Sequence, residues 1–222
     1  MLRKDSSQNK NPLDVSLPLV SPETGLQIGS LVTLNVDRLS SDFCAKYFKW
    51  REYSANMFLT KFDNSPEKVR DWFQNKVLPE KSRGVFLIND IYGDTIGVCG
   101  FCNLKENEVE LDTMMRGESV GSPDLMWLAQ RALIWWLLDN FQITKIFGKV
   151  LSKNFIVRHF HKQFGFSEYR RRPLKLLIND FGSEYVLSNE YKNMDEELIE
   201  MALYRDDYKS DVQPYLWPQI LR

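Results

Sequence analysis

The alternation of hydrophobic and polar positions along the chain predicts an ordered series of strands and helices. A period of two residues marks a strand, whereas apolar positions three and four residues apart mark one face of a helix. The pattern predicts strands over residues 28–39, 85–89, 95–104, 108–115, 145–152, 169–178 and 184–187. It predicts helices over residues 41–50, 65–78, 124–141, 154–164 and 195–205. Residues 51–64 are predicted to be a loop.

The order of these elements indicates how the sheet is built. Three strands follow one another closely between residues 85 and 115, which is typical of an antiparallel meander. The strand over 108–115 is then separated from the strand over 145–152 by a long helix, and such a crossover joins parallel strands. The sequence therefore predicts an α/β fold with a mixed sheet flanked by helices.

The expected domain lies between a polar N-terminal segment and a C-terminal segment. Residues 1–27 are polar, contain three prolines and show no regular period, so we expect an extended arm. Residues 28–188 are expected to form the domain, and residues 189–222 a C-terminal helix and tail that pack on it. The helix over 124–141 is apolar on nearly all sides, so we expect the Trp217-containing tail, or a second subunit in a homodimer, to cover it.

Charge and cysteine content exclude several classes of protein. The 29 Lys and Arg residues balance 30 Asp and Glu residues, so no bulk positive charge is available for nucleic acid or a membrane surface. No apolar run is long enough for a membrane helix, and three cysteines give no disulfide framework, so we expect a soluble cytoplasmic protein. Cys99 and Cys102 are interpreted as buried thiols on opposite faces of a strand, and no metal site is expected.

A glycine-containing loop between a strand and a helix is a candidate phosphate site. Gly117 and Gly121 lie between the strand over 108–115 and the next helix, for which Ser122 is the expected N-cap and Pro123 the first residue. Free backbone N–H groups and the partial positive charge of a helix N-terminus together bind polyphosphate. An ordinary glycine turn before a helix explains the same residues.

Two motifs in the sequence resemble those of the GNAT acyl-CoA N-acyltransferases. The segment Arg116-Gly-Glu-Ser-Val-Gly121 resembles the family pattern Q/R-x-x-G-x-G/A, with Ser119 at the position of the middle glycine. Further along the chain, Val150 and Asn154 match a second family pattern that ends in Gly-Phe.

The second pattern continues through the following helix. Gly165 and Phe166 match its end, Val157 replaces an alanine, and His161 stands where the family has a tyrosine. The resemblance covers residues 28–188.

The resemblance implies a fold and a cosubstrate. It implies a mixed, mostly antiparallel central sheet flanked by helices and splayed between its fourth and fifth strands. It implies acyl-CoA, either acetyl-CoA or a longer acyl-CoA, as cosubstrate without a metal, and direct transfer to a primary amine in a ternary complex. The positions that would bind the cofactor are Met114, Met115, Arg116, Gly117, Ser119, Gly121, Ser122 and Asn154.

Carboxylates and a histidine are the candidate catalytic groups. Glu108, Glu110 and Asp112 share one face of their strand, and the family often draws its base from this strand, so Glu110 and Asp112 are the candidates. A solvent-exposed outer face is the alternative. Helical geometry places His161 on the same flank as Asn154, where it would act as acid or base. The alternative is a hydrogen-bonded boundary histidine, and His159 is expected to face solvent.

Aromatic and basic residues are the candidate acceptor-binding groups. They are Trp50, Arg51, Tyr53 and Asn56 after the first helix, and Arg170 and Arg172 on a later strand. Packing of the first helix and a solvated strand are the respective alternatives. The Met-Met-Arg-Gly-Glu segment looks like that of bacterial amino-sugar acyltransferases of this family, which points to a nucleotide-linked amino sugar in polysaccharide biosynthesis as acceptor.

Two other functions fit the sequence. One is acetylation of a protein N-terminus or a lysine by an enzyme of the ribosomal-protein type. The other is a non-catalytic acyl-CoA-binding module, which Ser119 and the missing tyrosine suggest.

Overall fold

One mixed sheet runs through the part of the chain that the computed structural model describes, residues 14–62, 65–179 and 182–208. Its strands are β1 (Ser16–Val20), β2 (Gln27–Thr33), β3 (Thr60–Phe62), β4 (Gly84–Asp90), β5 (Thr95–Cys102), β6 (Glu108–Arg116), β7 (Lys145–Leu151), β8 (Ser167–Asn179), β9 (Gly182–Leu187) and β10 (Glu196–Tyr204). The helices are α1 (Ser41–Tyr53), α2 (Pro66–Trp72), α3 (Leu125–Asn140) and α4 (Phe155–Lys162). Short 3₁₀ turns cover Ala55–Met57 and Arg205–Asp207, and a π-helical turn, Phe73–Val77, continues α2.

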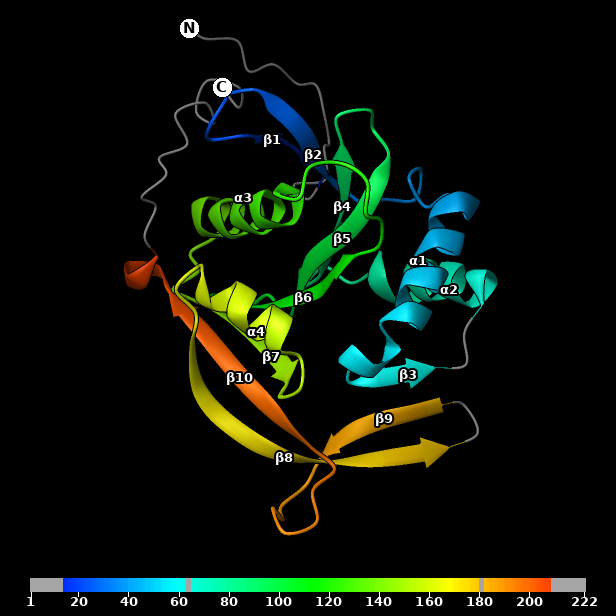
Figure 1. Ribbon diagram of the computed structural model, residues 1–222, viewed down its shortest axis with the longest axis vertical. Helices are drawn as coiled ribbons and strands as arrows, with labels where there is room; N and C mark the ends of the chain where they lie inside the picture. Colours follow the sequence, from blue (N-terminus) through cyan, green and yellow to red (C-terminus); the bar gives the residue numbers. More distant parts are fainter. Residues whose placement is uncertain (1–13, 63–64, 180–181, 209–222) are drawn as a thin grey trace, which may run out of the picture.

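The sheet order explains how the helices are arranged. The strands lie in the order β1-β2-β4-β5-β6-β7-β10-β8-β9-β3, and within it β6 and β7 are parallel whereas the other neighbours are antiparallel. Figure 1 shows α1 and α2 on one side of the central strands and α3 and α4 on the other. The predicted meander over β4, β5 and β6 and the parallel crossover to β7 are confirmed.

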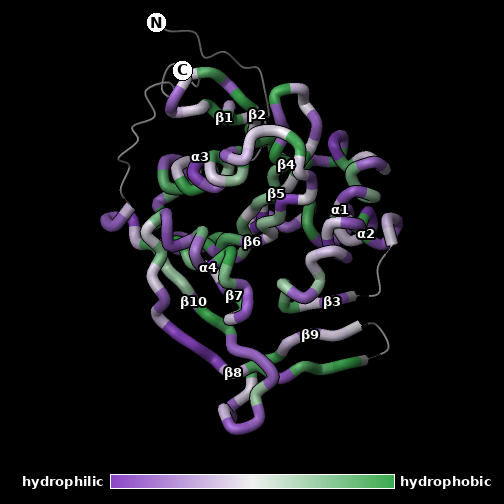
Figure 2. The backbone as a smooth tube through the Cα atoms, viewed as in Figure 1, coloured by the Kyte–Doolittle hydropathy of each residue, from purple (hydrophilic) through white to green (hydrophobic). Residues whose placement is uncertain are grey.

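Two hydrophobic clusters hold these layers together. The larger cluster packs α3 against β1, β2, β4 and β5, with Phe86, Phe101 and Trp136 in mutual ring contact. The smaller cluster packs α1 and α2 on the opposite face of the same strands. Figure 2 shows the hydrophobic stretches in the middle of the molecule around β5, β6 and α3. Both faces of the central strands are therefore buried.

The parallel strands β6 and β7 pair along only part of their length. Pairing runs from Glu108 opposite Lys145 to Leu111 opposite Gly148, although β6 continues to Arg116 and β7 to Leu151. These are the fourth and fifth strands in the order that the sequence predicts, so the expected splay is confirmed.

A β-bulge lies on β6 at the beginning of the splay. Val98 on β5 pairs with Met115 and Gly100 pairs with Asp112, so β6 has one more residue than β5 over this interval. Thr113, within it, has a φ of 54°. A bulge of this kind redirects the strand and its side chains.

The predicted C-terminal helix over residues 195–205 is wrong, because these residues form β10. The strand pairs with β7 on one side and with β8 on the other, and its residues from Leu198 to Leu203 are buried. Glu, Leu, Met and Ala favour helix locally, but pairing on both edges and burial of both faces override that preference. The C-terminal segment is therefore part of the sheet.

The N-terminal arm and the predicted loop also contain strands. Residues 16–20 form β1, which pairs with β2 and contributes Leu17 and Leu19 to the core beneath α3. Residues 60–62 form β3, which pairs with β9. Trp217 lies outside the described residues. Because β1 and β10 join the sheet of the central region, the described chain forms one domain.

Several predicted boundaries need smaller corrections. The first strand of the predicted domain ends at Thr33, not at residue 39. Ser65 caps α2 as predicted, but α3 begins at Leu125 with Asp124 as its N-cap, so Ser122 and Pro123 precede it. No helix among the described residues is both long and apolar enough to span a membrane.

Candidate functional site

A cavity of about 660 Å³ opens where β6 and β7 separate. The unpaired ends of both strands line it, with Asp112 and Met114 from β6 and Lys149 and Leu151 from β7. Side chains of α1 and α2 close it on one face of the sheet, whereas α3 and α4 contribute on the other. The cavity therefore joins the two faces of the sheet through the splay.

Two carboxylates face the cavity from β6 and have different partners. Glu110 is buried, and its Oε2 atom accepts hydrogen bonds of 2.8 Å from both Lys149 and Asn103. Asp112 is more exposed, and its contact with Arg83 is long, at 3.7 Å. Asp112 is therefore the more available proton acceptor of the pair.

His161 reaches the cavity from α4, on the opposite face of the sheet. The side chain is 4% exposed, and its Nδ1 atom lies 3.2 Å from the amide nitrogen of Gln130 on α3. Burial lowers the pKa of His161 to about 4, so the imidazole is uncharged at neutral pH. It can then donate a hydrogen bond as a neutral ring, and a charged imidazolium is disfavoured at this position. His159 is exposed, as predicted.

The loop between β6 and α3 is organised by the side chain of Arg116. Its guanidinium donates to the carbonyl oxygens of Glu118 and Val120, at 2.9 Å each, and of Ser122, at 3.2 Å. The same carbonyls are thereby drawn to one side of the loop. Gly121 has a φ of 78°, which favours glycine. Arg116 thus shapes the loop from within.

Only some backbone amides of this loop remain available to a ligand. The N–H groups of Gly117 and Glu118 both donate to the carbonyl of Ile96. Those of Ser119, Val120 and Gly121 have no hydrogen-bond partner among the described residues. These amides lie just before the N-terminus of α3, an arrangement that suits a phosphate group.

The remaining predicted cofactor positions differ in their surroundings. Met114 lines the cavity, whereas Met115 is buried against α1 and α2. Asn154 lines the cavity and caps α4, with its Oδ1 atom accepting from the Val157 amide at 3.3 Å. The backbone and Met114 side chain at the bulge, together with Asn154, therefore form the walls beside the splay.

Comparison with known families identifies the fold by sequence. Residues 34–167, more than half of the chain, match the acetyltransferase (GNAT) domain family. The chain belongs to the GNAT acetyltransferase family. It is therefore an acyl-CoA-dependent N-acetyltransferase, and the family uses acyl-CoA as cosubstrate without a metal. Comparison with curated protein sequences gives no significant match.

Solved GNAT structures share the fold at low sequence identity. The spermidine N-acetyltransferase from Vibrio cholerae, in complex with CoA and spermine, is 16% identical with a TM-score of 0.58, over 80% of this chain and 96% of that one. The ribosomal L7/L12 α-N-protein acetyltransferase in complex with coenzyme A is 13% identical with a TM-score of 0.63, over 87% and 99% of the chains. An acetyltransferase from Salmonella typhimurium that modifies the N-terminal serine of L7/L12 is 13% identical with a TM-score of 0.61, over 86% and 99%.

Of the acceptor-binding residues predicted on α1 and after it, the structure brings only Arg51 to the cavity of this GNAT domain. Trp50 is buried, and its indole N–H donates to Glu118 at 3.0 Å, so it supports the loop rather than contacting an acceptor. Tyr53, 96% exposed, and Asn56 do not line the cavity. The outward position of Tyr53 at the end of α1 carries its side chain away from the splay.

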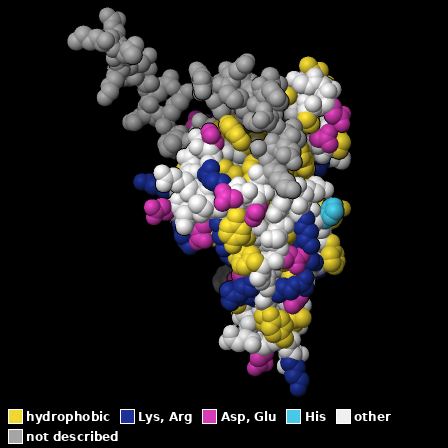
Figure 3. Space-filling model, turned by 90° about the vertical axis from the view of Figure 1, so that its left-hand side faces the viewer, with side chains coloured by type: hydrophobic (Ala, Val, Ile, Leu, Met, Phe, Trp, Pro, Cys, Tyr) yellow, Lys and Arg dark blue, Asp and Glu magenta, His cyan; other side chains and the backbone are white. Residues whose placement is uncertain are grey.

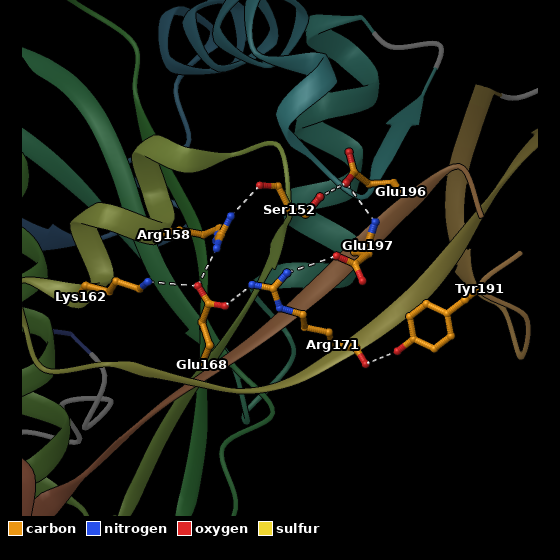
Figure 4. Close-up of polar contacts among 8 residues, drawn as sticks. All are labelled: Ser152, Arg158, Lys162, Glu168, Arg171, Tyr191, Glu196 and Glu197. Atoms are coloured by element: carbon orange, nitrogen blue, oxygen red, sulfur yellow. Dashed lines mark hydrogen bonds and ion pairs between the residues drawn. The ribbon is translucent and has the colours of Figure 1, made fainter. Parts of the chain in front are cut away.

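The arginines predicted on β8 also lie away from the cavity. Arg170 is exposed, and Arg172 pairs with Glu200 of β10 at 3.5 Å. Arg171, between them, points to the other face and joins a network centred on Glu168 (Figure 4). Arg171 and Arg172 connect β8 to β10, and none of the three arginines lines the cavity.

The network of Figure 4 fixes α4 to β8. Glu168 accepts from Arg158 at 2.6 Å, from Arg171 at 2.8 Å and from Lys162 at 3.2 Å. These bonds, that of Arg158 first, lower the pKa of Glu168 to about 2. Figure 3, which shows this side of the molecule, has basic and acidic side chains intermixed on its lower half rather than a patch of one sign.

Sequence reasoning missed much of the cavity lining, including the polar residue Tyr47 and the cations Lys68, Arg83 and Lys149. It also missed Gln130, which supports His161. A signal existed only for Gln130, which with the adjacent Arg131 interrupts the apolar stretch from Leu125 to Leu138. The cysteines agree with expectation, because Cys99 and Cys102 are buried free thiols and burial raises the pKa of both.

Proposed function

We propose that this enzyme transfers an acetyl or somewhat longer acyl group from acyl-CoA to the primary amine of a small anionic acceptor, specifically a nucleotide-linked amino sugar in polysaccharide biosynthesis. The observation that supports this proposal is the cavity through the splay. It places Asp112 and His161 on opposite faces of the sheet but in contact with one space. An amine held at Asp112 can therefore meet a thioester that enters from the α3 and α4 side.

The proposed reaction has two proton transfers, one before the amine attacks and one as the thiol leaves. Asp112 takes a proton from the ammonium group, directly or through water, and the neutral amine attacks the thioester carbonyl carbon. A C–N bond forms and the C–S bond breaks, while the second nitrogen proton ends on the departing sulfur, so that CoA leaves as the thiol. His161, uncharged at neutral pH, donates a hydrogen bond to the carbonyl oxygen or the sulfur.

The loop before α3 is the proposed site of the CoA pyrophosphate. The amides of Ser119, Val120 and Gly121 provide donors, and the positive end of the α3 dipole supports the charge. Gly117 and the guanidinium of Arg116 shape this loop, since their hydrogen bonds are made within the protein.

The charge of the cavity favours an anionic acceptor over a polyamine. Its charged side chains are Arg51, Lys68, Arg83, Lys149, Glu110 and Asp112, which is a surplus of cations. A polyamine such as the spermine bound by the Vibrio cholerae enzyme carries several positive charges and would need the opposite surplus. Protein N-terminal acetylation, the activity named for the ribosomal-protein enzymes, remains the second candidate because of the shared fold.

Thiol release from acetyl-CoA tests the proposal. The purified enzyme is assayed with nucleotide-linked amino sugars, amino-sugar phosphates, spermidine and a peptide with N-terminal serine, and products are identified by mass. We expect turnover on a nucleotide-linked amino sugar, and a fall in kcat of about 100-fold for Asp112→Asn. Asp71→Asn, an exposed position on α2, is the matched control.

The other outcomes each contradict a different part of the proposal. Turnover on spermidine or the peptide alone contradicts the acceptor class. Binding of acetyl-CoA without turnover on any amine favours the non-catalytic module.

A further inference from the structure

Two hydrogen-bond donors stand one turn apart on the cavity face of α1. Tyr47 and Arg51 are four residues apart, so they lie on the same side of the helix, and both line the cavity. Neither faces a carboxylate at ion-pair distance among the described residues. The pair therefore has no carboxylate in direct contact among the described residues, although the charge of Asp112 acts on both groups across the cavity.

Tyr47 is held firmly while its hydroxyl is unused. The side chain is 5% exposed, and its ring lies 4.9 Å from that of Phe73 and 6.3 Å from that of Trp72. The hydroxyl has no hydrogen-bond partner within the part of the chain that the structure describes. Burial raises the pKa of Tyr47 to about 12, so the phenol keeps its proton and can donate.

Arg51 is a largely desolvated cation with most of its donors unused. Its guanidinium lies 3.6 Å above the ring of Phe58, and one N–H donates to the carbonyl of Thr60 at 2.9 Å. Burial lowers the pKa of Arg51, which is the expected effect on a cation removed from water. The charge of Asp112 across the cavity opposes this effect, but among the described residues no ion pair with Arg51 is formed, so a bound oxyanion would give this cation a direct partner.

The acids lie on a different wall of the same cavity. Asp112 belongs to β6, at the splay, whereas Tyr47 and Arg51 belong to α1. Lys68 of α2 lines the cavity as well and adds positive charge. The walls thus separate a place for an ammonium group from a place for an anion.

We infer that Tyr47 and Arg51 form an oxyanion subsite that binds a phosphate or carboxylate group of the acceptor while its amine lies at Asp112. This inference rests on the proposed function and specifies where the acceptor's charge is bound. A guanidinium and a phenol together supply directed donors that match tetrahedral or planar oxyanions. The enzyme then selects acceptors that carry both an amine and an anion.

Paired ligands test the subsite through binding rather than activity. Affinity is measured by calorimetry in the presence of saturating CoA for glucosamine 6-phosphate against glucosamine, for β-alanine against ethanolamine, and for a nucleotide-linked amino sugar. In at least one of the first two pairs, we expect the anionic ligand to bind at least about tenfold more tightly than its uncharged counterpart. The pair that shows this difference tells whether the subsite prefers a phosphate or a carboxylate group.

The variants connect this preference to the two residues. Arg51→Gln is expected to abolish the preference, and Tyr47→Phe to reduce it several-fold, with melting temperatures reporting that each variant folds. Lys49→Gln removes the same charge from an exposed position on the same helix and is expected to retain the preference. Arg51→Lys keeps the positive charge but removes the planar guanidinium, and we expect it to retain part of the affinity for the anionic ligand.

The outcomes distinguish this inference from the proposed function. Three results would overturn the subsite: equal affinities within both pairs, an undiminished preference in Arg51→Gln, or no binding of any ligand at 10 mM, which is about tenfold above the weakest typical KM values. An anion preference that depends on Arg51, together with no acetyl transfer to any amine, would support the subsite while contradicting the proposed reaction.

Discussion

Gln130 on α3 lies 3.2 Å from the Nδ1 atom of His161 on α4, and both side chains are buried. With the Gln130 amide donating to Nδ1, the ring proton resides on Nε2. That atom is close to β7, since a Cβ built on Gly148 would come within 3.6 Å of it. The contact therefore orients the imidazole toward the strand that borders the splay.

The low pKa of His161 predicts a pH-dependent stability. The unfolded chain binds a proton near pH 6.5 that the folded protein does not bind until about pH 4, so the free energy of unfolding falls as pH decreases through this window. The effect is of the order of 3 kcal/mol, at about 1.4 kcal/mol per pH unit. Denaturant unfolding at pH 7.5 and 4.5 measures it.

Two histidine variants isolate this effect from other titrating groups. His161→Gln is expected to lose this part of the pH dependence, whereas His159→Gln, at an exposed position, is expected to keep it. Identical pH dependence in both variants would contradict the assignment to His161.

Glu110 and Asp112 are predicted to respond differently to loss of charge. Glu110→Gln removes the buried partner of Lys149, so we expect the free energy of unfolding to fall by about 1–3 kcal/mol. Its effect on kcat should be smaller than that of Asp112→Asn, whose carboxylate has only a long contact with Arg83. Unfolding curves and steady-state rates for both variants check this, and a larger kcat loss in Glu110→Gln would reverse the assignment.

Gly117→Ala is predicted to destabilise the loop before α3. A Cβ at this position would lie 1.9 Å from the indole of Trp50, so the loop or the ring must move. We expect a loss of about 1–3 kcal/mol in unfolding free energy, as for other overpacked sites. In the double variant Gly117→Ala/Trp50→Leu, the smaller leucine side chain relieves the clash, so the loss of unfolding free energy should be less than the sum of the two single losses. Additive losses would argue against direct contact.

Glu168→Gln is predicted to weaken the attachment of α4 to β8. The change leaves Arg158 partly buried without its carboxylate, and we expect about 1–3 kcal/mol of destabilisation. Raised salt should narrow the difference from wild type, because Lys162 and Arg171 are more exposed partners. Glu190→Gln, an exposed position, serves as control, and an equal loss there would show that the network contributes little.

Local sequence patterns predicted the elements whose stability is local. Ser65 and Pro66 begin α2, Asn154 begins α4, and Gly165 has the left-handed φ of 92° expected after a helix. The strands of the meander were likewise predicted, because β4 and β5 are short apolar runs bounded by polar turn residues, a pattern typical of strands buried on both faces. Asn154 and Gly165 also belong to the second GNAT motif.

The sequence by itself determined the meander and the crossover, since both depend on periodicity, caps and residue spacing along a short stretch. Its two motifs indicated the family, and the resemblance to that family implied the splay. Only the tertiary structure decided that residues 196–204 form a strand, because their hydrogen bonds are made with β7 and β8. It also decided which acceptor candidates reach the cavity. Arg51 lines the cavity at the splay, whereas Arg172 pairs with Glu200 of β10. This difference depends on where α1 and β8 lie relative to strands that are remote from them in sequence.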